Sequence, residues 1–141
     1  MPLVGGGGAP NVAGSNPTGV GTGINYIGNH AFSYNNYIAS TTSTSKLDFA
    51  TGGEYIVGAF ALGPLINPTD TTDGKKSIAE IKFNNQTVAT LTSDAAAQDQ
   101  QTPQTTQLLV PPYTHVQFNV KGQSDSASYT GTASFTGRVY A

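Results

Sequence analysis

The chain has 141 residues, of which only 10% are charged, and its formal net charge is −2. Thr, Ser, Asn and Gln instead make up about a third of it. This composition excludes a helical bundle or a coiled coil. It favours strands joined by tight turns, because Thr is β-branched and Gly and Asn suit turns. The absence of Cys excludes disulfides, thiolate metal sites and thiol nucleophiles.

The charge distribution and the hydropathy pattern indicate whether the protein binds nucleic acid or a membrane. The six Lys and Arg residues are scattered, and Lys75-Lys76 is their only adjacent pair. Binding to nucleic-acid phosphates needs clustered cations, so we expect no nucleic-acid partner. No apolar run approaches the roughly 20 residues of a membrane-spanning helix, and the amino terminus lacks the cationic flank and apolar stretch of a secretion signal. The sequence therefore predicts no membrane partner and assembly in the compartment of synthesis.

Residues 1–28 differ from the rest, since they hold nine Gly and three Pro. Ordering a backbone costs about 1–2 kcal/mol per residue, and a buried aliphatic side chain returns only about 1.5–3 kcal/mol. This segment is therefore either a disordered tail or linker, or an extended arm that gains order only against a partner. The spaced apolar residues and the lack of charge before Lys46 favour the arm. Its candidate anchors are Leu3, Val4, Val12, Val20, Ile24 and Tyr26.

Residues 29–141 form the second unit, in which about eight short alternating segments are separated by turns. The segments are 30–40, 45–50, 54–62, 75–83, 86–92, 105–110, 115–121 and 127–140. Asn84-Asn85 predicts a tight hairpin turn, because Asn tolerates positive φ. Residues 67–74 and 93–103 are expected to be loops. The unequal loop lengths favour a single jelly-roll β-sandwich over an up-and-down barrel.

The residues with catalytic or metal-binding side chains show no recognisable constellation. His30 and His115 are expected to be hydrogen-bonded strand residues rather than metal ligands. Asp70 and Asp73 fit an Asx turn better than a calcium loop. The two glutamates give no reason for an elevated pKa, and no Gly-x-Ser-x-Gly motif is present. The sequence therefore predicts no enzyme, no cofactor and no metal site.

Seven Tyr and six Phe leave a sugar-stacking site open as an alternative. Tyr34, Tyr37, Tyr113 or Tyr129 could provide its platform. The cores and subunit contacts of β-sandwiches use the same residue types, and we favour that explanation. The segment 54–62 carries apolar side chains on both faces, as a strand does between two layers or at a subunit contact.

Three segments carry a family resemblance: GINYIGNHAFSY at 23–34, LDFATGGEYIV at 47–57 and FTGRVY at 135–140. They resemble small proteins encoded among the structural genes of tailed bacteriophages, the capsid decoration or cement proteins. The Phe-x-Gly at 135–137 is similar to the last strand of trimeric jelly rolls of the TNF and C1q kind. The resemblance does not extend before Gly23, so a role for the arm rests on the physical argument alone.

The resemblance implies a structural virion protein, made in the host cytoplasm and seated as a homotrimer on the outer capsid surface. There it would bind and bridge neighbouring major capsid proteins, with the arm anchors as its capsid-binding residues. The trimer seam would comprise Tyr55, Val57, Phe60, Phe135 and Tyr140. The alternatives are a carbohydrate- or receptor-binding β-sandwich module of a phage tail or fibre, and a generic secreted or self-assembling β-sandwich.

Overall fold

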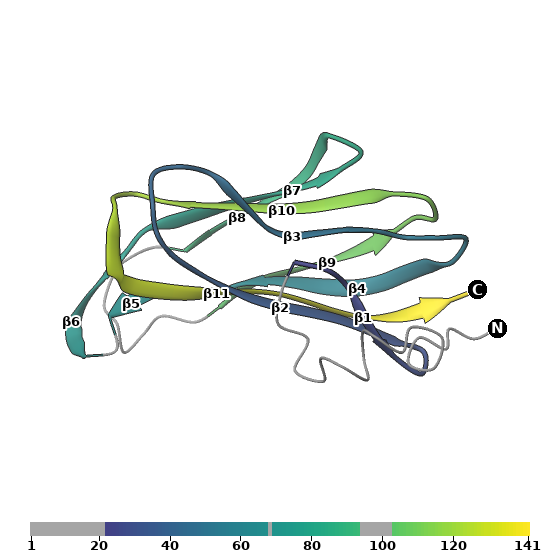
Figure 1. Ribbon diagram of the computed structural model, residues 1–141, viewed down its shortest axis with the longest axis horizontal. Helices are drawn as coiled ribbons and strands as arrows, with labels where there is room; N and C mark the ends of the chain where they lie inside the picture. Colours follow the sequence, from purple (N-terminus) through teal and green to yellow (C-terminus); the bar gives the residue numbers. More distant parts are fainter. Residues whose placement is uncertain (1–21, 68, 94–102) are drawn as a thin grey trace.

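The structure, a computed structural model, describes residues 22–67, 69–93 and 103–141. Its regular elements in those ranges are all strands, which form two antiparallel sheets packed face to face. Sheet A is the lower layer of Figure 1 and sheet B the upper one. The all-β class predicted from the sequence is confirmed.

Sheet A has seven strands and sheet B has four. The main path of sheet A is β1 (Asn25–Ile27), β2 (His30–Ala39), β11 (Ser126–Tyr140), β4 (Tyr55–Leu62) and β9 (Gln104–Val110). Beside β11, sheet A also contains the pair β5 (Leu65–Asn67) and β6 (Asp70–Lys75). Sheet B runs in the order β3 (Thr44–Ala50), β10 (His115–Gly122), β7 (Ser77–Phe83) and β8 (Gln86–Ser93).

The strand pairing is that of a jelly roll. Without the short strands β1, β5 and β6, eight strands remain: the first pairs with the last (β2 with β11), the second with the seventh (β3 with β10), the third with the sixth (β4 with β9) and the fourth with the fifth (β7 with β8). A long hairpin rolled into two sheets produces this pattern. The eight strands correspond to the eight predicted segments, so the predicted fold is confirmed.

Local sequence explains the tightest connection. The turn between β7 and β8 is made by Asn84 and Asn85, with φ of 53° and 69°. Both lie in the left-handed region that a two-residue hairpin turn requires and that Asn tolerates. The hairpin predicted at this position is confirmed. The loop predicted over residues 67–74 is not, because Asp70–Lys75 form strand β6 against β5.

The core lies between the inner faces of the two sheets. Strict alternation in β10 buries Val116, Phe118 and Val120 and turns the residues between them outward. The Phe60 ring packs 4.5 Å from Phe135 and 5.8 Å from Phe118, measured between centroids. Such aromatic clusters bury large apolar areas. This layer supplies most of the hydrophobic stabilisation.

One glycine pair allows the sheet A side of this core to close. Gly58 and Gly137 are directly opposite each other in β4 and β11. A Cβ on Gly58 would lie 2.5 Å from the Thr136 carbonyl oxygen and 2.7 Å from the Phe135 ring. Glycine at this point therefore lets the Phe135 ring lie directly on the backbone of β4.

The sandwich begins earlier than the sequence predicts. Strand β1 pairs with β2, and Gly28, with φ of +60°, lies in the turn between them. Upstream, the Thr22 carbonyl accepts a bond of 2.8 Å from the Asp48 amide, and the Gly23 carbonyl accepts one of 2.6 Å from the Ser33 hydroxyl. Residues 22–28, predicted as the end of the arm, are thus hydrogen-bonded parts of the body. Residues 1–21 lie outside the described part.

Candidate binding face

The outer surface of sheet A is a candidate binding face, which we call the A face. It consists of the side chains of β1, β2, β11, β4 and β9 that point away from sheet B. The pairing registers place one continuous row of side chains across all five strands. That row is Ile27, His30, Arg138, Val57 and Leu109.

The A face is almost free of charge and carries most of the exposed large apolar side chains of the described residues. The described residues include eight large hydrophobic side chains that are exposed, and five of them are on this face. These five are Ile27, Tyr34, Ile38, Leu109 and Tyr140. Arg138 is the only Lys, Arg, Asp or Glu in its five strands. These side chains are interspersed with exposed polar ones such as Asn36, Thr132 and Gln107. Exposed apolar surface bordered by polar residues is a feature of interaction sites.

Two tyrosines stack at one end of the A face. The rings of Tyr55 and Tyr140, directly opposite each other in β4 and β11, have centroids 5.1 Å apart and an interplanar angle of 13°. The Arg138 guanidinium carbon lies 5.8 Å from the Tyr140 centroid. A guanidinium over an aromatic ring is attracted to its π-face and is weakly hydrated. The single cation of this face is therefore compatible with a covered surface.

A shallow hollow of about 490 Å³ lies at the other side of the A face, over β1, β2 and β11. Its aromatic wall is formed by Phe32 and Tyr34, with ring centroids 5.5 Å apart. Ile27, at 57% exposure, and Thr136 line the remainder together with His30, Ala31 and Gly137. The A face is therefore recessed, and a partner surface could insert a side chain there.

The structure separates the five predicted seam residues into two groups. Tyr55, Val57 and Tyr140 lie on the A face. Phe60 and Phe135 have no exposed surface, because they fill the space between the sheets. Placing these two phenylalanines at a seam was therefore wrong. The cause is strand parity: residues an odd number apart on a regular strand point to opposite faces.

The same parity would have found the A-face residues that the sequence analysis did not assign to a subunit contact. Tyr34 and Ile38 in β2 are an even number of residues apart and are 40% and 50% exposed. Leu109 is exposed because its neighbours Leu108 and Val110 already pack on the core side. Ile27 carried no such signal, because β1 was assigned to the arm.

The predicted arm anchors also divide. Ile24 and Tyr26 are half-buried and pack against the core of their own domain. Burial, and to a lesser extent the nearby Glu54 carboxylate, raises the pKa of Tyr26 to about 12. These two residues therefore stabilise the body. Their prediction as arm anchors was wrong. The other four anchors, Leu3, Val4, Val12 and Val20, lie outside the described residues.

The outer surface of sheet B, the B face, is polar instead. One row of paired residues crosses it as Asp48, Gln117, Lys82 and Thr87. The next row is Asn119, Glu80 and Thr90. Charges of both signs alternate with amides and hydroxyls, as on a hydrated surface.

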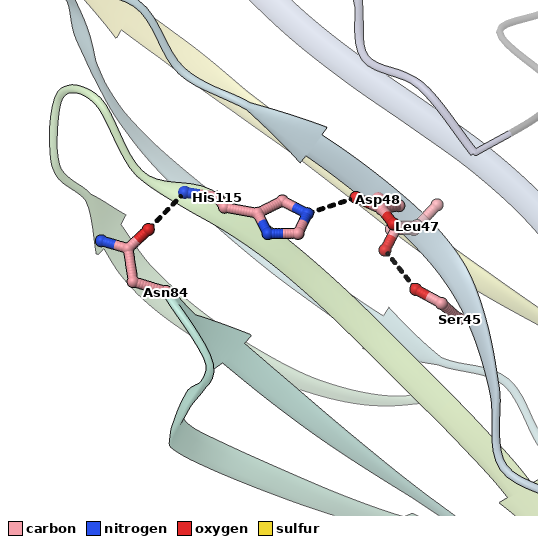
Figure 2. Close-up of polar contacts among 5 residues, drawn as sticks. All are labelled: Ser45, Leu47, Asp48, Asn84 and His115. Atoms are coloured by element: carbon pink, nitrogen blue, oxygen red, sulfur yellow. Dashed lines mark hydrogen bonds and ion pairs between the residues drawn. The ribbon is translucent and has the colours of Figure 1, made fainter.

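Figure 2 shows a short polar contact of the B face. The His115 Nε2 lies 2.6 Å from an Asp48 carboxylate oxygen, and the Asn84 side-chain oxygen accepts a 2.8 Å bond from the His115 amide. The Ser45 hydroxyl donates to the Leu47 carbonyl rather than to the imidazole. Ser45, His115 and Asp48 therefore do not form the arrangement of a serine hydrolase.

The sequence analysis predicted no metal site and no membrane-spanning helix, and the described residues bear on both. Among the described residues no group of three or more His, Asp or Glu could hold a metal ion. The Asp70 and Asp73 side chains lie outside the described part. In the ranges that the structure covers, no helix is long and apolar enough for a membrane crossing.

Of the four candidate platform tyrosines, Tyr37 is excluded because it is 3% exposed. Its hydroxyl donates to the Gly63 carbonyl at 2.7 Å and lies 3.0 Å from the Ser77 hydroxyl, which links the two sheets. Burial raises the pKa of Tyr37 to about 12. Tyr37 is therefore a structural residue of the core.

Comparison with known proteins adds no functional information to the description of the two faces. No family model matches the chain, and no curated protein matches its sequence. The apolar A face and the polar B face are thus the features from which a function can be argued.

Proposed function

We propose that this protein is a capsid decoration protein: a homotrimer that binds the outer surface of a tailed-phage capsid and bridges neighbouring major capsid proteins. The observation that carries the proposal is the A face, with five exposed large apolar side chains and one charged residue in its strands. Obligate subunit contacts are apolar in this way at their centre. The resemblance of residues 23–34, 47–57 and 135–140 supplies the class of protein.

In this proposal the A face is the contact between subunits. Tyr140 and Leu109 lie on the two sides of Val57, since β4 is between β11 and β9. Three copies joined there by a threefold axis would cover these side chains, and each contact would be heterologous. The charged B faces would remain in water.

The arm supplies the second contact, to the shell. Residues 1–21 could reach about 70 Å when fully extended, at roughly 3.3 Å per residue. Three such arms on one trimer act together, because the first attachment raises the effective concentration of the other two. Individually weak contacts then give a long-lived attachment, which a protein that reinforces a shell requires.

The test compares the full chain with a variant that begins at Thr22. The deletion stops there because the Thr22 and Gly23 carbonyls are hydrogen-bonded within the body. Both proteins are mixed with shells assembled from the major capsid protein of the same genome, and co-sedimentation and cryo-electron microscopy measure occupancy. We expect the full chain to saturate the shells and the shortened chain to bind at least about tenfold more weakly.

Thermal melting of the shortened chain is the control, and it should match that of the full chain. Full occupancy by the shortened chain would contradict the arm assignment. A full chain that does not bind the shells would overturn the proposed function itself.

A further inference from the structure

Two adjoining hollows lie at one end of the B face. The first, of about 270 Å³, is lined by Ser43, Ile78, Glu80, Thr90, Asn119 and Lys121. The second, of about 250 Å³, is lined by Lys76, Ser77, Ile78, Thr92, Lys121, Gly122 and Gln123. They share Ile78 and Lys121, which are directly opposite each other in β7 and β10. The two hollows therefore form one depression over β10, β7 and β8, which we call the B groove.

One end of the B groove lacks a hydrogen-bond donor. The side-chain oxygen of Asn119 is buried and has no partner. A buried acceptor left unpaired costs about 1–3 kcal/mol. Because the Asn119 side chain lines the first hollow, a rotation that brings this oxygen to the groove would let a ligand donor recover that cost. Glu80 is opposite Asn119, and its carboxylate accepts a bond of 3.0 Å from the Thr87 hydroxyl. This end thus offers the Glu80 carboxylate and the Thr90 hydroxyl, with the buried Asn119 oxygen beside them.

The other end of the B groove is cationic. Lys76 and Lys121 both line the second hollow. The Gln123 amide donates to the Lys76 carbonyl at 2.9 Å, which holds the end of β10 beside the start of β7. Between the two ends stands Ile78, which is 39% exposed. The groove therefore offers in sequence two ammonium groups, an apolar side chain and a set of oxygen acceptors.

We propose that the B groove binds an acidic saccharide of the uronic-acid class. The sugar carboxylate pairs with Lys76 and Lys121, the apolar face of the ring packs on Ile78, and ring hydroxyls donate to Asn119 and Glu80. A saccharide fits better than an acidic peptide, because its hydroxyls donate and accept at adjacent positions. Each hollow is slightly smaller than the pocket of a drug-sized ligand, about 300 Å³, which suits one sugar ring. The inference does not depend on the proposed function.

The test is a nuclear magnetic resonance titration of the ¹⁵N-labelled full chain with digalacturonic acid and, separately, with neutral maltose. We expect the acidic sugar to shift backbone amides of residues 76–80, 90–92 and 119–123, and to bind at least about tenfold more tightly than maltose. Unchanged spectra at tens of millimolar sugar would overturn the proposal. Shift changes confined to the A face, or equal binding of the two sugars, would overturn it as well.

Matched variants localise the site. Asn119→Leu removes the unpaired acceptor and should weaken binding at least about tenfold without loss of stability, since an apolar side chain carries no orphaned oxygen. Gln117→Leu is the control, because Gln117 lies two residues away on the same strand and face. Lys76→Gln should reduce the preference for the acidic sugar over maltose. Wild-type binding by both Asn119→Leu and Lys76→Gln would contradict the site.

Discussion

The two outer faces of the sandwich differ far more than its two inner faces. The five strands of the A face contain one charged residue, and the four strands of sheet B contain five. Those five are Lys46, Asp48, Glu80, Lys82 and Lys121. The inner faces must both be apolar to build one core, whereas nothing in the fold requires the outer faces to differ. Their difference is the basis of our two proposals, in which the A face meets another protein surface and the B face meets water and small polar ligands.

The largest expected effect separates the core from the A face. Phe60→Ala should lower the free energy of unfolding by about 3–5 kcal/mol, because it leaves a cavity between the sheets. Tyr140→Ala removes a side chain that is 38% exposed, and it should weaken self-association more than it lowers stability. Urea unfolding and sedimentation of both variants measure the two quantities. If Phe60→Ala dissociated the trimer without lowering the free energy of unfolding, Phe60 would be a subunit-contact residue and not a core residue.

The second prediction compares exposed aliphatic residues on the two edge strands β9 and β8. Leu109 is 54% exposed on the A face, and Val88 is 42% exposed in sheet B. Leu109→Lys should weaken self-association at least tenfold, or about 1.4 kcal/mol, because a covered ammonium group has no partner. Val88→Lys should leave association unchanged. Sedimentation equilibrium measures both.

A wild-type mass near three chains that falls only with Leu109→Lys would support the A face as the subunit contact. An equal fall with Val88→Lys would remove the distinction between the faces. A strictly monomeric wild type would contradict the trimer.

The smallest expected effect concerns the polar contact of the B face. The His115 and Asp48 side chains are 45% and 42% exposed, and exposed ion pairs contribute about 0.2–1 kcal/mol. Asp48→Asn should therefore lower the free energy of unfolding by less than about 1 kcal/mol. A double-mutant cycle with His115→Asn measures the coupling, and a value well above that range would show that this contact stabilises the fold.

The strands were predictable wherever alternation in the sequence was strong. The run through Val116, Phe118 and Val120 identifies β10, and Asn84-Asn85 identifies the turn from β7 to β8. Strand β1 was not predictable, because its three residues follow a Gly-rich segment and acquire strand geometry by pairing with β2. Strand β6 was not predictable either, because it contains Asp and Gly, which have low strand propensity. Its pairing with β5 overrides this low propensity.

The candidate site was less predictable than the fold. The sequence indicated two aromatic strands, which pair with each other in the middle of sheet A. It could not tell Tyr55 and Tyr140 from Phe60 and Phe135 without a parity count anchored on a known core residue. The B groove had no sequence signal. Asn119 and Lys121 are far from Lys76 and Ile78 in the chain, and only the pairing of β10 with β7 brings the two pairs of residues together.

Composition and alternation alone determined that this chain is a β-sandwich with little charge, because side-chain period and turn chemistry are local properties of a chain. Which side of each strand meets the other sheet was decided only by tertiary structure, since both sides of β4 are apolar and the choice depends on what packs against them. The same holds for the contrast between the two outer faces. It arises when strands distant in sequence are paired, so that a row such as Ile27, Arg138 and Leu109 becomes one surface.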